Sequence, residues 1–269
     1  MRICQYSYVR KQVICFVYKP TTLQAFVLQC IKTFLLKMNS TIKKSMVKGL
    51  GIGIGLMFLS SFNHANAQVV DKGWKQLFNG KDINNFEQVG PGKHYVEDGT
   101  IRSHGGMGLL YWKGGKLANC TIKVVYQMQK SNSNSGVFIR IPLEPREPWM
   151  PVFYGYEVQI DNHPETSNED EYHVTGTLYS LTKPLAKPGK PGPEWNTMEI
   201  TLDGPRTIVY VNGEKVTDYK EGDPTPERKF DFEPYHGIRP NAGWFGLQNH
   251  GDDDIVYFKE VAIKPLKKK

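Results

Sequence analysis

Residues 156–161 read YEVQID and alternate large apolar side chains with groups that can exchange protons. In a β-strand, successive side chains point to opposite faces of the sheet. One face would carry apolar bulk, including Tyr156, and would pack in the core. The other would carry a carboxylate, an amide and a second carboxylate in line, namely Glu157, Gln159 and Asp161. Carboxyl groups serve as general acids and bases. The polar face is therefore either a solvated surface or the floor of a site.

Two further stretches place polar or aromatic groups on the non-core face of a strand. In GVFIRI, Arg140 shares a face with an aromatic ring, and in GWFGLQNHG a polar face carries Trp244, Gln248 and His250. If these strands are neighbours of YEVQID, the groups form one concave surface. An indole for stacking, together with forked polar groups for hydroxyls, is a mixture that binds sugars. A solvated sheet face remains the alternative.

His173 and His250 lie beside predicted strands and are the candidate proton donors. No H-E-x-x-H or comparable metal-binding spacing is present. Three consecutive acids at 252–254 lack the twelve-residue calcium-loop pattern, so we interpret them as a solvated turn.

The elements that must position these residues are short segments rich in Val, Ile, Tyr, Phe and Thr, bounded by Gly, Asn, Asp and Pro. Asn212-Gly213 between two apolar runs predicts a tight hairpin. Proline-rich stretches at 142–155 and 182–195 should be loops, which either border the site or are plain surface excursions. About ten strands at short spacing predict an all-β antiparallel sandwich or jelly roll.

The N-terminal region has the layout of a targeting sequence. Residues 38–67 contain a basic stretch, an apolar stretch and a small-x-small site ending at Ala67, which predicts a secretory signal peptide. Residues 1–37 precede a second plausible start, and we interpret them as a misassigned start or a disordered extension, with an N-terminal anchor as the alternative. Residues 68–269 would form a single domain that is periplasmic or secreted and has no membrane attachment after cleavage.

Charge and cysteine content also change at this boundary. The whole chain carries +7, but 25 of its 34 Lys and Arg and all 27 acids follow Ala67, which leaves −2 for residues 68–269. That balance argues against a nucleic-acid partner. Only Cys120 lies in this part, so no disulfide can form within it.

Seven segments resemble, in the same order, the family of 3-keto-disaccharide hydrolase domains, also called 3-keto-glucoside 1,2-lyase and 3-keto-2-hydroxy-glucal hydratase domains. They span residues 73–266 and read GWKQLFNGKDINNFE, NSNSGVFIRI, GYEVQIDN, TGTLYS, EWNTMEITLDG, VYVNGEKV and GWFGLQNHG…VYFKEVAIKPL. Asn249 departs from a common Asp, and Lys259 from a common Arg.

The resemblance implies a concanavalin A-like antiparallel jelly roll and a glycoside substrate already oxidised to a ketone at C3. A ketone there acidifies the hydrogen on C2. Its removal allows the C1 oxygen to leave, and water can add to the resulting glucal, so the net reaction is hydrolysis. The resemblance also implies a partner oxidoreductase that makes the ketone.

Within that scheme, Glu157 or Asp161 would be the base and His173 or His250 the proton donor. Arg140 and Gln159 would bind the C3 oxygen or adjacent hydroxyls, and Trp244 and Gln248 would form a sugar-binding wall. No motif in the sequence identifies a cofactor. It leaves open a divalent metal held by the carboxylates and a histidine.

Two other functions remain alternatives. The E-x-Q-x-D pattern resembles laminarinase-type glycosidases, in which two carboxyl groups lie close together. In a regular strand, however, the Cα atoms of Glu157 and Asp161 are about 13 Å apart. The other alternative is a non-catalytic carbohydrate-binding module, whose sugar binding would tolerate the loss of both carboxylates.

Overall fold

The computed structural model describes residues 3–9, 12–18, 73–163 and 171–267, and the chain divides into two units, Met1–Val69 and Val70–Lys269. In the first unit, β1 (Ile3–Val9) pairs antiparallel with β2 (Gln12–Tyr18). The predicted signal peptide at 38–67 lies outside the described residues. No helix among the described residues is long and apolar enough to span a membrane.

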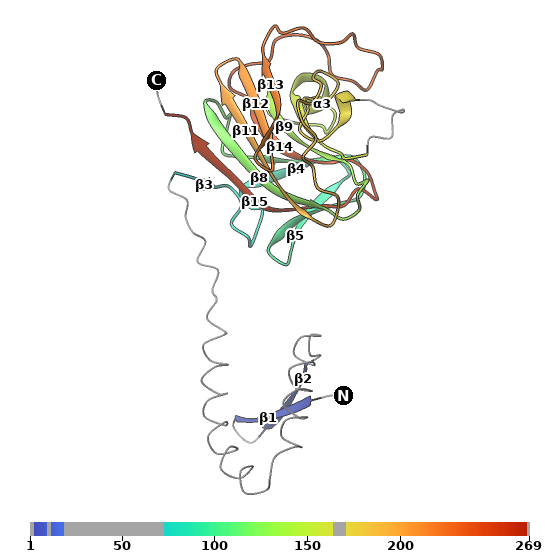
Figure 1. Ribbon diagram of the computed structural model, residues 1–269. Coiled ribbons are helices and arrows are strands. Elements are labelled where there is room, and N and C mark those ends of the chain that lie inside the picture. Colours follow the sequence, from blue (N-terminus) through green and yellow to red (C-terminus); the bar gives the residue numbers. More distant parts are fainter. Residues whose placement is uncertain (1–2, 10–11, 19–72, 164–170, 268–269) are drawn as a thin grey trace, which may run out of the picture. The chain divides into compact units, whose positions relative to one another are not determined.

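The second unit consists of two antiparallel sheets (Figure 1). The five-stranded sheet contains, in spatial order, β10 (Tyr156–Ile160), β9 (Ser135–Ile141), β14 (Trp244–Asn249), β7 (Gly108–Trp112) and β4 (Phe86–Val89). The eight-stranded sheet contains β13 (Glu214–Lys220), β12 (Arg206–Val211), β11 (Trp195–Asp203), β8 (Cys120–Met128), β15 (Val256–Pro265), β6 (Thr100–His104) and β5 (Lys93–Glu97), with β3 (Lys75–Gln76) paired to β15. The predicted all-β sandwich is confirmed.

The core lies between the two sheets. Strand β11 alternates buried and half-buried residues along its whole length, as expected for a strand with one face packed and one face solvated. From the five-stranded sheet, β10 contributes Tyr156, Val158 and Ile160 to this core, which confirms the predicted inward face. The buried thiol of Cys120 also belongs to the core.

The connections follow the predicted turn chemistry in most places. Asn212 and Gly213 join β12 to β13 with φ values of 50° and 86°, the left-handed pair that a tight hairpin requires. The proline-rich stretch at 182–195 is irregular until β11 begins. The stretch at 142–155 also connects strands, but it contains the short helix α3 (Met150–Tyr154), which was not expected. A 3₁₀ turn, η1 (Glu171–His173), lies between β10 and β11.

Candidate active site

Strands β10, β9 and β14 lie side by side, as the polar-face hypothesis requires. Glu157 pairs with Phe138, and Gln159 with Gly136, across the β10–β9 ladder. On the other side of β9, Leu247 of β14 pairs with Val137, so the next residue, Gln248, lies beside Gly136. The non-core faces of three strands therefore meet around Gly136.

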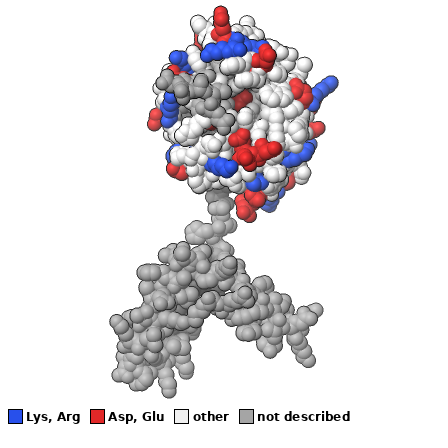
Figure 2. Space-filling model, turned by 90° about the vertical axis from the view of Figure 1, so that its right-hand side faces the viewer, with Lys and Arg blue, Asp and Glu red and all other residues white. Residues whose placement is uncertain are grey.

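A cavity of about 460 Å³ opens on this face, within the roughly 300–1,000 Å³ typical of small-molecule sites. Its polar lining consists of Asn132, Asn134, Glu157, Gln159, Asp161, His173, Gln248, His250 and Asp254, and its apolar and aromatic lining of Met107, Trp149, Val152, Tyr179 and Phe232. Figure 2 views the side of the domain that carries α3 and shows acidic side chains gathered near the middle of that face, with basic side chains mainly toward its margin.

Gly136 makes room for the Glu157 side chain. A Cβ atom at position 136 would lie 2.4 Å from Oε1 of Glu157 and 2.7 Å from its Cγ. The absence of a side chain lets the carboxyl group lean from β10 across β9. There it hydrogen-bonds with the side chain of Gln248 on β14. The glycine thus lets groups from two non-adjacent strands touch.

The carboxyl groups of Glu157, in β10, and Asp161, directly after β10, differ in acidity. Burial raises the pKa of Glu157 to about 8, although nearby His250 and the Gln248 hydrogen bond oppose the rise. Burial also raises the pKa of Asp161 to about 6, against a hydrogen bond from the backbone N–H of His163, which lies 2.8 Å from Oδ1. At neutral pH, Glu157 therefore keeps its proton while Asp161 is ionised. Such divergence marks acid and base roles in known sites.

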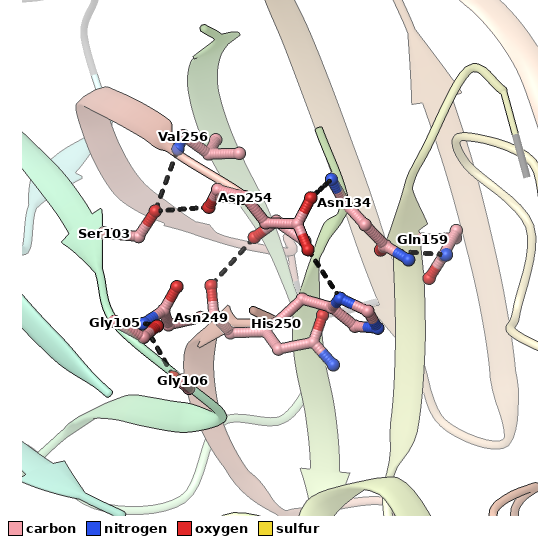
Figure 3. A network of polar contacts seen from close by, with 11 residues as sticks. Ser103, Gly105, Gly106, Asn134, Gln159, Asn249, His250, Asp254 and Val256 are labelled. Atoms are coloured by element: carbon pink, nitrogen blue, oxygen red, sulfur yellow. Dashed lines mark hydrogen bonds and ion pairs between the residues drawn. The ribbon is translucent and has the colours of Figure 1, made fainter. Parts of the chain in front are cut away.

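His250 pairs with Asp254, its Nδ1 lying 2.7 Å from Oδ2 (Figure 3). This hydrogen bond raises the pKa of His250 despite partial burial, and the charge of the nearby Asp161 carboxylate adds to the rise. The imidazole is 48 % exposed, so it can meet a ligand in the cavity.

Asp254 is itself fixed by the backbone, because the N–H of Asn134 donates to Oδ1 at 2.8 Å. Burial would raise the pKa of Asp254, but the bonds from His250 and Asn134 outweigh it and hold the pKa below its usual value. The interpretation of 252–254 as a plain solvated turn is wrong for this residue, which lines the cavity and orients His250.

His173 enters the cavity from η1. Its Nε2 lies 2.8 Å from Oγ of Ser180 and 4.0 Å from Oε1 of Glu233, and its ring stacks on Tyr179 with centroids 4.5 Å apart. The Ser180 hydroxyl donates in turn to Glu233. Because Glu233 belongs to the β13–β14 loop, these hydrogen bonds through Ser180 connect that loop to His173 in the cavity.

The structure brings six of the eight predicted site residues to the cavity and places two elsewhere. Arg140 has φ of 54°, and the β9–β14 register shifts there, so two residues of β9 face one of β14. This bulge breaks the alternation and turns the Arg140 side chain toward the opposite sheet. Its guanidinium donates to Thr207 Oγ1 and to the carbonyl oxygens of Gly204, Arg206 and Pro240. The predicted substrate-binding role of Arg140 is therefore wrong.

Trp244 is also absent from the cavity lining, which corrects its assignment to a sugar-binding wall. Its ring packs edge-on against Tyr111, with centroids 5.7 Å apart, in a small apolar cluster that includes Val152. Trp244 therefore packs in a cluster that shares Val152 with the cavity lining.

Sequence reasoning missed the residues contributed by loops. Asn132 and Asn134 come from the NSNSG turn before β9, and Trp149 and Phe232 from the loops before α3 and β14. Strand periodicity carries no information about them. The only signal was the aromatic content of the proline-rich stretch that contains Trp149.

Asn249 has a structural role. Its Nδ2 donates to the carbonyl oxygens of His104, Gly105 and Gly106 at the turn before β7 (Figure 3). An ionised carboxylate cannot donate to these groups. Among the described residues, no group of three His, Cys, Asp or Glu side chains is placed to hold a metal ion.

Comparison with known proteins identifies the family. The model of the 3-keto-alpha-glucoside-1,2-lyase-like domain matches residues 73–264. No curated protein is significantly similar to the chain. Two solved structures from Parabacteroides distasonis ATCC 8503, each provisionally described as a glycosyl hydrolase, are 27 % and 25 % identical with TM-scores of 0.60 and 0.59. Each alignment covers 72 % of this chain, and 94 % and 99 % of the respective relative.

A galectin-like protein of unknown function from Bacillus subtilis is 10 % identical, covers 72 % of this chain and 96 % of its own, and has a TM-score of 0.50, which supports the fold alone. The family match and the two Parabacteroides structures support a carbohydrate-active enzyme. The chain belongs to the family of 3-keto-alpha-glucoside-1,2-lyase-like domains.

Proposed function

We propose that the protein cleaves 3-keto-glucosides by removing the hydrogen on C2 and eliminating the oxygen substituent on C1. The observation that carries this proposal is the placement of Glu157 and Asp161 in one cavity, where burial raises the pKa of Glu157 to about 8 and that of Asp161 to about 6. Elimination next to a ketone needs both states at once, a base for carbon and a neutral donor for the carbonyl oxygen.

Asp161 is the base in this mechanism. Its carboxylate takes the C2 proton, and the electron pair of that C–H bond forms the C2–C3 double bond of an enediolate. The electrons then return, the C3 carbonyl re-forms, a C1–C2 double bond appears and the C1–O bond breaks. Imidazolium His250, whose charge Asp254 stabilises, gives its proton to the departing oxygen. Addition of water to C1 of the unsaturated ketone completes a net hydrolysis.

Glu157 stabilises the charge that develops on the C3 oxygen. A buried, neutral carboxylic acid donates a hydrogen bond to an enolate oxygen without first losing a solvation shell. Gln248, hydrogen-bonded to Glu157 and buried beside it, fixes the direction of that carboxyl group. From the sequence, either Glu157 or Asp161 could be the base; in this mechanism Asp161 is the base and Glu157 the neutral donor.

The description of the two Parabacteroides structures favours a second candidate, hydrolysis of an unoxidised glycoside. In that case, a carboxylate attacks C1 or activates water, and no ketone is needed.

We propose that cleavage of the 3-keto-glucoside takes place outside the cytoplasm, after removal of the signal peptide near Ala67. A separate oxidoreductase would form the C3 ketone.

The test is to incubate purified protein with 3-keto-glucosides and with their unoxidised parents, with and without EDTA. Released aglycone and the absorbance of the unsaturated ketone are followed together. We expect release only from the ketone, accompanied by the enone signal. Release from the parent glycoside would instead establish a conventional glycosidase, and binding without release from either would indicate a sugar-binding module.

A further inference from the structure

The cavity has a polar floor and an aromatic component that the proposed reaction does not use. Trp149 and Phe232 line the same cavity as Glu157 and Asp161, yet the two aromatic residues remain 43 % and 41 % exposed. Large aromatic side chains bury much more of their surface when a partner is present. Two such rings in one cavity therefore indicate a part of the ligand that lies beyond the reacting sugar.

Both rings are supported by stacking on the protein side. Trp149 stacks on Phe153, with centroids 6.0 Å apart and planes 24° from parallel, and Phe232 stacks on Phe230 at 5.1 Å and 8°. The ring of Phe153 also packs against that of Tyr235, with centroids 5.2 Å apart. Rings held in this way lose little conformational freedom when a ligand binds.

The two segments that carry the rings are tied together by Arg239. This buried guanidinium donates to the carbonyl oxygens of Phe153 and Gly155, at and just after α3, and to those of Tyr235 and Gly237 in the β13–β14 loop. The segments that carry Trp149 and Phe232 are therefore held together by hydrogen bonds within the protein.

The chemistry of the lining separates the two parts of a glycoside. Groups that bind sugar hydroxyls or exchange protons come from β10, from β14, from the residues directly after these two strands, from the turn before β9 and from η1. The segments around α3 and the β13–β14 loop contribute Trp149, Val152 and Phe232, which offer apolar faces and no hydrogen-bonding side chain except the Trp149 indole N–H. A second sugar ring would need partners for its hydroxyls, whereas a planar apolar group would not.

We propose that Trp149 and Phe232 form a leaving-group subsite that selects glycosides with a planar aromatic aglycone. The inference rests on the proposed function, because it assigns the bond to be broken to the junction between the polar floor and the aromatic rings.

The experiment compares phenyl and methyl 3-keto-glucosides, in both anomers, on wild-type protein and on Trp149→Ala, Phe232→Ala and Trp149→Phe. Each variant's kcat/KM is divided by the wild-type value for the same substrate, so intrinsic leaving-group reactivity cancels. We expect each alanine variant to lose about tenfold on the phenyl substrate, as loss of one stacking partner predicts, and to stay within about twofold on the methyl substrate. Trp149→Phe should retain most of the activity.

Leu143→Ala and Ile238→Ala are matched controls. These side chains are 68 % and 81 % exposed, lie in the same two connecting segments and do not line the cavity. Both control variants should keep the wild-type kcat/KM on the phenyl and the methyl substrate. An equal loss on phenyl and methyl substrates in Trp149→Ala would overturn the subsite. An equally large loss on a 3-keto-disaccharide would overturn its preference for an aromatic group.

If the wild-type protein turns over none of these ketones, the proposed function fails and the subsite is tested by binding alone. Calorimetric titration with phenyl glucoside then decides: binding that Trp149→Ala abolishes and Trp149→Phe retains supports the subsite. No binding, or binding that is indifferent to Trp149, rejects it.

Discussion

At the scale of single residues, the site depends on two carboxyl groups, one in β10 and one directly after it, that differ in pKa. Burial acts on both, but Asp161 receives a backbone hydrogen bond that favours its anion. Glu157 lies over Gly136 beside the amide of Gln248 and is the more strongly shifted of the two.

This difference predicts a bell-shaped pH dependence of kcat/KM. Asp161 must lose its proton, so activity should rise through pH about 6, and Glu157 must keep its proton, so activity should fall above pH about 8. His250 must also be protonated, and its hydrogen bond to Asp254, which raises its pKa, favours that state. Initial rates at low substrate concentration measure the profile. A rate that still rises at pH 10 would contradict these roles.

Substitutions separate the base from the neutral donor. Asp161→Asn removes the base and should lower kcat by about 10²–10⁴. Glu157→Gln keeps an N–H donor in nearly the same shape and should cost about tenfold or less, whereas Glu157→Ala should cost about 10²–10³. Steady-state kinetics on a 3-keto-glucoside give the comparison. Equal losses in the Gln and Ala variants would assign Glu157 a role other than donor.

The raised pKa of Glu157 also affects folding. In the unfolded chain this group ionises near pH 4.5, but in the folded protein it keeps its proton up to about pH 8. Its contribution to stability is therefore full below pH 4.5 and is lost progressively as pH rises to 8. Glu157→Gln, which cannot ionise, should gain thermal stability relative to wild type across this window and hold the gain above pH 8. Melting curves at pH 4, 6 and 9 test this, and a constant difference would contradict it.

At the scale of elements, the five-stranded sheet joins groups from separate parts of the chain around one glycine. Gly136→Ala should place a methyl group against the Glu157 carboxyl group and destabilise the protein by about 1–3 kcal/mol. In the double variant with Glu157→Ala the clash is absent, so the two stability losses should not add. Urea unfolding of the four proteins measures the coupling. Additive losses would show that the two side chains do not compete for space.

The same elements show what the sequence could predict about the site. The alternation of β10 was read correctly because the strand is regular across the whole YEVQI segment. Arg140 was misplaced because a bulge, caused by one left-handed residue, changes which face a side chain takes. Asp254 was missed because its function depends on the N–H of Asn134, 120 positions away. No local pattern encodes such a contact.

At the scale of the whole molecule, the two sheets are joined by polar as well as apolar contacts. Arg140 leaves the five-stranded sheet and donates to Thr207 and Arg206 of β12 and to Pro240 of the β13–β14 loop. Arg140→Met should cost about 3–5 kcal/mol of unfolding free energy, since it leaves several buried acceptors unpaired. The positions of the two limbs of the pH profile should not move. Chemical denaturation of this variant tests the stability loss, and its pH-dependent kinetics test the unchanged profile. A shift of either limb would show that Arg140 acts on the catalytic groups.

The fold class was predictable for a different reason than the site. Short β-branched and aromatic runs bounded by turn residues specify an antiparallel sandwich through many weak, consistent signals, so one bulge does not alter the outcome. The cavity depends on a few loops whose course is set by contacts such as those of Arg239. Their sequence alone indicates only that they are irregular.

The reactivity of Cys120 can be used to measure how often the domain opens. It is the single thiol after Ala67, it lies in the core, and burial raises its pKa to about 11. A thiol reagent added to residues 68–269 can therefore react only when the sandwich opens, and the labelling rate gives the population of open molecules without any engineered probe. For the same reason, the fold needs no oxidant, and the domain should reach the same structure in a reducing or an oxidising compartment.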